Sequence, residues 1–233
     1  MHRFYLPSFQ QPVLSAEEAH HAAHVLRVKT GDTVNVFDGL GHEGQCRMEA
    51  NGKLTLLTQS STPPLPCRIM LAQAIPKKNM DLIVQKATEF GAAGILPLIS
   101  ERTIVQLDED SKKVDRWREI ALEACKQSGN NWLPEIAAPQ KARAFLDAPG
   151  NFDLKLIASL QPDSKPLKQI LPEKRPASVL VLIGPEGDFT PAELSAAKSA
   201  GCLPLSLGPL VLRAETAALY ALSILHHELQ TDG

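Results

Sequence analysis

The chain has 233 residues, 44% of them hydrophobic, and a formal net charge of -2 from 24 basic and 26 acidic residues. This composition excludes a disordered chain and is that of a globular protein with one large domain, or a small and a medium one. The first residues, MHRFYLP, contain no apolar signal segment, and no apolar run reaches the ~18 residues of a membrane span. We therefore expect a soluble, cytoplasmic protein. Its four scattered cysteines, without a C-x-x-C pair, predict buried reduced thiols and no metal site.

The charge distribution limits where a nucleic acid could bind. A net charge of -2 argues mildly against a nucleic-acid binder, because such proteins carry a basic surface. Residues 67–178 hold 17 Lys and Arg against 14 Asp and Glu, whereas residues 179–233 hold 2 against 6. Contacts with phosphate are therefore expected from the middle segment, from single arginines near the N-terminus, or from two subunits together.

The N-terminal part of the chain predicts a small β-rich domain. Ser15 and Glu18 form a capping box that begins a helix, and this helix is expected to end near Gly31. An alternating pattern then predicts an antiparallel barrel, with the hairpin signal Asn51-Gly52 before its last strand. The predicted strands are 33–38, 43–50 and 53–59.

The proline-rich run SSTPPLP at 60–66 is the natural linker between two domains. We therefore place one domain at residues 1–66 and a second at 67–233. In the second, apolar strands alternate with amphipathic helices, which predicts an α/β fold with a parallel sheet. Its strands are expected at 69–75, 95–99, 154–160, 179–183 and 203–207, and its helices at 79–90, 111–128, 165–171, 191–200 and 213–229.

Two of these strands end in glycine turns, GPEGDF at 184–189 and SLGPLVLRAETA at 206–217. In α/β sheets, ligands bind at the carboxyl ends of the strands, where glycine lets backbone approach them closely. The turns lack the G-x-G-x-x-G spacing of a dinucleotide site. Each glycine alone is explained equally well by a plain turn, but the pair of motifs is more specific and predicts a binding site.

These motifs, together with MDLIVQKATEFG at 80–91, resemble the SPOUT methyltransferases. The similarity is greatest to the family that methylates N3 of a uridine in 16S ribosomal RNA, whose members carry GPEGG followed by LGPRxLRxETA. The resemblance covers nearly the whole chain. It implies a parallel-sheet domain with a deep C-terminal trefoil knot, a PUA-like N-terminal β-barrel that grips RNA, and a homodimer. It also implies S-adenosylmethionine (AdoMet) as cofactor and the small ribosomal subunit as partner.

The resemblance assigns seven residues to the AdoMet pocket, with two departures nearby. Asp188 stands where the family has its second turn glycine, and Leu210 where it has an arginine. If that glycine provides a positive φ, Asp is one of the few residues that tolerate it, so we expect the pocket to be retained. The loss of the arginine is expected to affect contact with RNA or substrate. The seven residues are Leu160, Gly184, Glu186, Gly187, Leu207, Gly208 and Leu212.

Methyl transfer from AdoMet is an in-line displacement that depends mainly on position, without a nucleophilic triad or a metal. Uridine N3 must lose a proton, and the negative charge spreads onto O2 and O4, where a cation lowers the barrier. We predict Arg213 as that cation. Glu186 or Glu215 is either the base or a group that orients Arg213 and substrate, and Glu215 is equally well explained as a first-turn acid favoured by the helix dipole.

Candidate RNA contacts follow from the resemblance, although solvated surface lysines and arginines are the plain alternative. Asn130 and Trp132 stand where the family commonly has arginines. The loss of these two cations is expected to weaken RNA affinity, or to be compensated by Trp132 stacking on a base. His20 and His24 have the spacing of a metal pair but lack a third ligand, which favours a solvated helix face. The candidate contacts are Arg3, Arg27, Lys29, Lys77, Lys78, Lys86, Arg102 and Trp132.

Two other functions stay open at this point. A different SPOUT activity, ribose 2'-O or guanine N1 methylation, would share the cofactor motif. A catalytically decayed RNA-binding or ribosome assembly factor is suggested by the low basic charge and by the departures at Asn130, Trp132, Asp188 and Leu210. The identity of the methylated nucleoside distinguishes another SPOUT activity from the predicted uridine N3 methylation. Binding of AdoMet distinguishes an active enzyme from a catalytically decayed factor.

Overall fold

The computed structural model describes residues 2–104 and 112–230 and divides into two compact units. The first unit comprises residues 1–64 together with residues 122–133. The second comprises residues 65–121 and 134–233. The division between residues 64 and 65 falls inside the proline-rich run. Residues 122–133 follow this run in the sequence but belong to the first unit.

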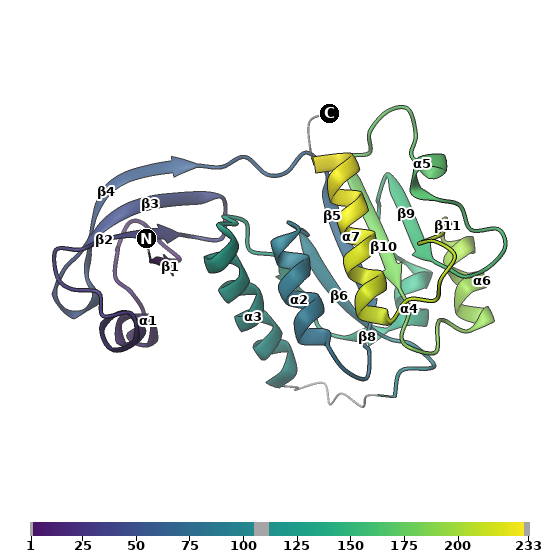
Figure 1. Cartoon of the computed structure of the whole chain (residues 1–233), viewed down its shortest axis with the longest axis horizontal. Coiled ribbons are helices and arrows are strands. Elements are labelled where there is room, and N and C mark those ends of the chain that lie inside the picture. Colours follow the sequence, from purple (N-terminus) through teal and green to yellow (C-terminus); the bar gives the residue numbers. More distant parts are fainter. Residues whose placement is uncertain (1, 105–111, 231–233) are drawn as a thin grey trace. The chain divides into compact units, whose positions relative to one another are not determined.

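The first unit is built on a four-stranded sheet with the strand order β1-β2-β3-β4 (Figure 1). The three predicted strands, now β2 to β4, are confirmed and pair antiparallel. Strand β1 pairs in parallel with β2 and was not predicted, because three residues are too few to show a period. The elements are β1 (Arg3–Tyr5), α1 (Ala16–His20), the π-helical turn η1 (His21–Val25), β2 (Thr33–Phe37), β3 (His42–Met48), the 3-10 turn η2 (Ala50–Gly52) and β4 (Leu54–Ser61).

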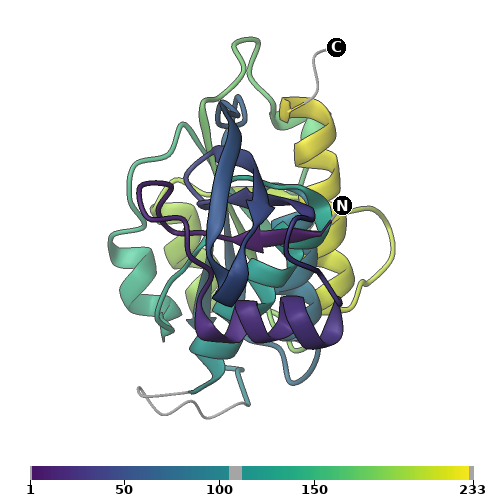
Figure 2. The ribbon, with the colours of Figure 1, turned by 90° about the vertical axis from the view of Figure 1, so that its left-hand side faces the viewer.

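The N-terminal helix, purple in Figure 2 below the strands, is shorter than predicted. Ser15 Oγ accepts from the backbone N–H of Glu18 at 3.1 Å, as expected for a helix cap. The carboxylate of Glu18 pairs with Lys126, a contact that a local pattern cannot reveal. The predicted end near Gly31 is wrong, because the helical segment ends at Val25 and Arg27 has a left-handed backbone with φ 56°.

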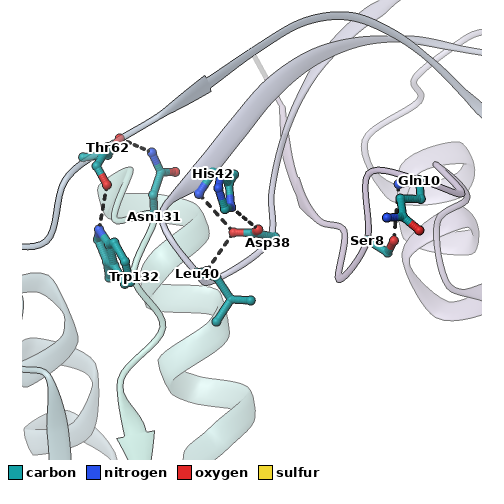
Figure 3. Close-up of polar contacts among 8 residues, drawn as sticks. All are labelled: Ser8, Gln10, Asp38, Leu40, His42, Thr62, Asn131 and Trp132. Atoms are coloured by element: carbon teal, nitrogen blue, oxygen red, sulfur yellow. Dashed lines mark hydrogen bonds and ion pairs between the residues drawn. The ribbon is translucent and has the colours of Figure 1, made fainter.

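Residues that follow α3 (Lys112–Ser128) contact residues at the ends of β3 and β4 in the first unit. The Nε1 of Trp132 donates to the carbonyl of Thr62 at 3.0 Å, and Nδ2 of Asn131 donates to Thr62 Oγ1 at 2.7 Å (Figure 3). Gly41 has φ +94°, and a Cβ at this position would lie 2.4 Å from the indole ring. The indole therefore fits only because residue 41 is a glycine.

The second unit is an α/β layer structure on a seven-stranded sheet, and each pairing in the part of this sheet that the structure describes is parallel, as predicted. Its strand order is β11-β9-β10-β5-β6-β7, with β8 also on β6. The strands are β5 (Arg68–Ala74), β6 (Gly94–Ile99), β7 (Glu135–Ile136), β8 (Gln140–Lys141), β9 (Leu154–Ala158), β10 (Ser178–Ile183) and β11 (Leu203–Leu205). The helices besides α3 are α2 (Met80–Glu89), α4 (Ala142–Asp147), α5 (Leu167–Ile170), α6 (Pro191–Ser199) and α7 (Ala214–Gln230).

Helices cover both faces of this sheet, which explains its continuous apolar strands. Leu180 and Leu182 of β10 pack in one core with α4 and α6. The alternate residues Val179, Val181 and Ile183 face the other side, where α7 lies against β10 and β5 and also contacts α2 (Figure 1). The short elements β7, β8 and α4 were not predicted. The predicted first residue of α3, Ser111, lies outside the described residues.

One buried carboxylate connects the start of α6 to the residues that follow β6. Thr190 and Glu193 form the predicted capping box, with Thr190 N–H donating to Glu193 Oε2 at 2.9 Å. The second oxygen of Glu193 accepts from the backbone N–H of Glu101, just after β6, at 3.0 Å. Glu193 is only 1% exposed, so both bonds lie in a water-poor environment where a lost partner is costly.

All four cysteines are buried free thiols, which confirms the expectation from their spacing. Burial raises the pKa of Cys67 and of Cys202 to about 11 and that of Cys125 to about 12. These thiols are therefore protonated and unreactive at neutral pH.

Glu193→Ala is expected to lower the free energy of unfolding by about 2 to 4 kcal/mol, because it removes the carboxylate half of the capping box and leaves the backbone N–H groups of Thr190 and Glu101 without acceptors. Urea denaturation followed by circular dichroism measures the loss. Glu119→Ala, at an exposed position of α3, is the control and should change stability by less than about 0.5 kcal/mol. Equal losses in the two variants would contradict this account.

Gly41→Ala is expected to destabilise the protein more than Gly31→Ala. Both glycines have nearly the same positive φ, +94° and +95°, so both substitutions carry the same backbone strain of about 1 kcal/mol. In the described part of the chain, a methyl group at position 31 would meet no atom within 4 Å apart from its chain neighbours. The methyl group at position 41 meets the Trp132 indole and should cost about 1 to 3 kcal/mol more. Chemical denaturation of the two variants measures the difference, and equal midpoints would rule out the packing constraint.

Candidate active site

The carboxyl ends of neighbouring parallel strands bring the two predicted glycine turns together. β9 lies between β10 and β11, so the chain leaves all three strands at the same edge of the sheet. A pocket opens at this edge and is formed by the residues that follow these strands and by the start of α7. Its lining is Ala158, Ser159, Leu160, Ile183, Gly184, Pro185, Glu186, Asp188, Leu207, Gly208, Leu210, Val211, Leu212, Ala214 and Ala217.

The GPEGD turn is closed by one backbone hydrogen bond and one bond to the side chain of Asp188. The N–H of Asp188 donates to the carbonyl of Pro185 at 2.9 Å, and Asp188 Oδ1 accepts from the N–H of Phe189 at 2.7 Å. Asp188 has φ +60°, so it adopts the left-handed conformation that was expected at this departure from the family pattern. A Cβ on Gly184 would lie 3.0 Å from Asp188 Oδ1, a tight contact, so the close turn favours glycine there.

The second loop is more exposed and supplies an apolar rim. Gly208 has φ +109°, a conformation that L side chains rarely adopt, and its N–H donates to Ser206 Oγ at 3.3 Å. Beyond it, Leu210 is 73% exposed and Val211 is 80% exposed, although both line the pocket. Leu160, across the pocket after β9, is 59% exposed.

Six of the seven residues predicted to bind AdoMet line this pocket: Leu160, Gly184, Glu186, Leu207, Gly208 and Leu212. Gly187 is not among the lining residues, and its carbonyl accepts from the Arg102 guanidinium. The end of the predicted strand at 154–160 was the available signal for two further lining residues, Ala158 and Ser159, and Ile183 ends the predicted strand at 179–183. The other lining residues that were not assigned to the cofactor lie within the two glycine motifs: Pro185, Asp188, Leu210, Val211, Ala214 and Ala217.

Arg213, the predicted catalytic cation, immediately precedes α7, between the lining residues Leu212 and Ala214. Its side chain is exposed. In residues 2–104 and 112–230 its guanidinium has no hydrogen-bond or ion-pair partner. Its five N–H donors are therefore available to a ligand.

The two candidate carboxylates bind the turn between β5 and α2. Glu186 lines the pocket, and its Oε1 accepts from the backbone N–H of Lys77 at 2.8 Å. Glu215, in the first turn of α7, accepts from Asn79 Nδ2 at 3.0 Å. Both acids therefore lie at the edge of the sheet that carries the pocket, held by neutral N–H donors.

The candidate RNA contacts of the second unit differ in the exposure of their side chains and in the partners that these side chains already have. Lys77 and Lys78 are exposed and line a groove that also includes Lys113 and Arg116. Lys86 pairs with Glu89 at 2.8 Å within α2. The exposed Arg102 contacts the GPEGD turn through Gly187.

In the first unit, Arg3 and Trp132 are held by internal contacts. The Arg3 guanidinium is partly buried, lies 4.1 Å from the centre of the Phe37 ring, and donates to the Cys125 carbonyl and to Asn131 Oδ1. Burial lowers the pKa of Arg3, although nearby Glu43 and Cys125 act in the opposite direction. Trp132 donates to Thr62 (Figure 3).

Arg27 and Lys29 are both exposed on the first unit. The backbone N–H of Lys29 donates to Asp32 Oδ2 at 2.8 Å, which fixes the turn but leaves the lysine ammonium out of this contact.

The rings of the exposed His20 and His24 lie 4.4 Å apart. In the described part of the chain, no three His, Cys, Asp or Glu side chains gather in a way that could hold a metal ion. Within the same residues, each helix is too short or too polar to cross a membrane.

Comparison with known proteins places both units in one family. Residues 63–226 match the RNA methyltransferase domain, and residues 14–58 match the RNA methyltransferase PUA domain. The ribosomal RNA small subunit methyltransferase E of Bacillus subtilis is 30% identical over 99% of this chain and 98% of the relative.

Two solved structures are similar over almost their whole length. The Neisseria gonorrhoeae ribosomal RNA small subunit methyltransferase E, bound to S-adenosyl methionine, has 32% identity and a TM-score of 0.88, with 98% of both chains covered. A putative methyltransferase from Legionella pneumophila, in complex with the same cofactor, has 36% identity and a TM-score of 0.87, with 97% of both chains covered. The chain therefore belongs to the ribosomal RNA small subunit methyltransferase E family.

Proposed function

We propose that this protein transfers a methyl group from AdoMet to N3 of a uridine in the 16S ribosomal RNA of the small ribosomal subunit. The observation that carries the proposal is one pocket built from the GPEGD turn and the LGPLVLR loop, with Arg213 directly beside its lining residues. Membership of the family, and the two AdoMet-bound neighbours, support the same cofactor and the same class of substrate.

The pocket residues fit AdoMet. Apolar side chains such as Leu160, Ile183 and Leu212 suit an aromatic base, and the backbone of the Gly184 and Gly208 turns offers donors and acceptors at close range. When bound there, AdoMet supplies a methyl group already activated by its sulfonium. The residues of the chain then have to place the uridine, stabilise charge and accept a proton.

Arg213 is proposed to stabilise the negative charge that develops on O2 and O4 of the uracil as N3 loses its proton. Its lack of a partner among the described residues leaves the guanidinium free for this contact. Glu186 and Glu215 are the two carboxylates at the same edge of the sheet, and we propose that one of them accepts the N3 proton while the other orients the site.

RNA binding is proposed to be shared between residues 1–66, as a PUA-like domain that grips RNA, and the methyltransferase domain at 67–233. Exposed cations carry most of this role, because an exposed ammonium or guanidinium can neutralise phosphate. The proposed contacts with exposed side chains are Arg27, Lys29, Lys77, Lys78 and Arg102. The other three candidates, Arg3, Lys86 and Trp132, are only partly exposed and already have partners within the chain, so their proposed share is smaller. A cytoplasmic location follows from a ribosomal substrate.

We also propose a homodimer and a C-terminal knot. The exposed apolar side chains of Leu160, Leu210 and Val211 beside the pocket are suited to cover by a second copy. The chain runs from β10, inside the sheet, out to the edge strand β11 and then returns as α7 to β10 and β5. Such a return across the sheet is the kind of path that a trefoil knot needs.

Arg213→Ala is expected to lower the rate of methyl transfer by about 100-fold or more while leaving the Kd for AdoMet nearly unchanged, because the cation acts on charge that develops in the reaction. The assay measures labelled methyl transfer from AdoMet to small subunits from cells lacking this gene, followed by nucleoside analysis. Arg143→Ala, at an exposed position on α4, is the matched control.

The nucleoside that carries the label decides between the proposed functions. N3-methyluridine, lost in Arg213→Ala but not in Arg143→Ala, supports the proposal. Label in another nucleoside contradicts the uridine N3 assignment, and the absence of both label and AdoMet binding in the wild type would leave an RNA-binding factor.

Gly208→Ala is expected to weaken AdoMet binding by about tenfold or more, because a side chain at φ +109° distorts the loop that lines the pocket. Gly201→Ala, at φ +87° after α6, carries similar strain away from the pocket and is the control. Among the residues that the structure describes, and apart from its immediate chain neighbours, no atom lies within 4 Å of the new methyl group at either position. Isothermal titration calorimetry gives both Kd values, and equal affinities would argue against a cofactor role for this loop.

A further inference from the structure

The turn between β5 and α2 lies against two segments that are distant in sequence. Ile183 of β10 pairs with Gln73 of β5, so the GPEGD turn leaves the sheet beside the residues that follow β5. The backbone N–H of Lys77 donates to Glu186 of that turn at 2.8 Å. Two residues later, Asn79 Nδ2 donates to Glu215 Oε1 at 3.0 Å. The turn between β5 and α2 is thereby hydrogen-bonded to Glu186, which lines the pocket, and to Glu215 at the start of α7.

Asn79 has an unusual conformation for its place in the fold. It is the N-cap residue of α2, but its side chain makes no capping hydrogen bond to that helix. Its backbone is left-handed, with φ 69° and ψ 16°, a conformation that Asn tolerates better than most residues. The amide therefore serves a contact with α7 in place of its own helix, where a capping bond would ordinarily be favourable.

The contact with Asn79 constrains Glu215 without neutralising it. A neutral amide donor holds one carboxylate oxygen and leaves the negative charge of Glu215 in place, unlike a lysine or arginine partner. Arg213 lies two residues away and has no partner in the portion of the chain that the structure describes. The arrangement provides a held carboxylate and a guanidinium without a described partner, two residues apart in sequence.

We propose that Asn79 is a positioning residue for methyl transfer that acts through Glu215. Its left-handed backbone directs the amide at the carboxylate, and the amide holds the carboxylate in the place from which it serves the reacting uridine. This inference rests on the proposed function and adds to it a residue that does not line the pocket. The fold supports it because the contact joins residues 136 positions apart.

The test compares the full-length wild type with Asn79→Gly, Glu215→Ala and the double variant. Glycine keeps the left-handed backbone available and removes only the amide. With labelled AdoMet and unmodified small subunits, Asn79→Gly should lower kcat by about tenfold or more and leave the KM for subunits and the Kd for AdoMet within about twofold. In the double variant, loss of the amide should add nothing to the effect of Glu215→Ala.

Asn51→Gly is the matched control, since Asn51 is also left-handed, at φ 59°, but lies in the first unit. It should behave as the wild type, and the thermal midpoints of all variants show whether stability alone is affected. An unchanged kcat in Asn79→Gly, a change in KM alone, or a further loss in the double variant would each overturn the role of Asn79. If the wild type transfers no label, the proposed function fails and this inference fails with it.

Discussion

The parallel pairing of β10 with β5 and β9 is the constraint on which the rest of the site depends. β10 is buried on both faces, and its apolar residues 179–183 hold it inside the sheet. Because its neighbours run in the same direction, the loops after β5, β9 and β10 all leave at one edge. The pocket, the two carboxylates and the turn at Lys77 and Asn79 exist only because of this common edge.

Left-handed residues shape this edge, and the contacts around them offset the strain. Asp188, Gly208 and Asn79 have φ values of 60°, 109° and 69°. The Asp188 side chain binds the next backbone N–H, and the Asn79 side chain binds Glu215. Residues in such conformations persist where surrounding structure holds them, and they concentrate at functional sites. The departure from glycine at Asp188 therefore retains the geometry of the turn.

The basic residues discussed above fall into two groups, those held by internal contacts and those exposed near the pocket. Arg3 is held by Phe37 and by backbone and side-chain acceptors inside the first unit, so its charge contributes to packing. Lys77, Lys78 and Arg213 are exposed at the edge of the sheet that carries the pocket. A chain of net charge -2 can thus present exposed cations at the edge of the sheet that carries the pocket.

Six residues of the pocket were predicted from the resemblance to the family. The residue pattern itself determined the α/β class, the strands and helices of regular period, and the capping box of α6. These features are local, since period, caps and turn conformations depend on neighbours in the chain. Only the tertiary structure revealed strand β1, the pairing of Glu18 with Lys126, the packing of Trp132 on Gly41 and the bond between Asn79 and Glu215. Each of these joins positions with no shared local pattern, so packing of the whole sheet or unit decides whether they meet.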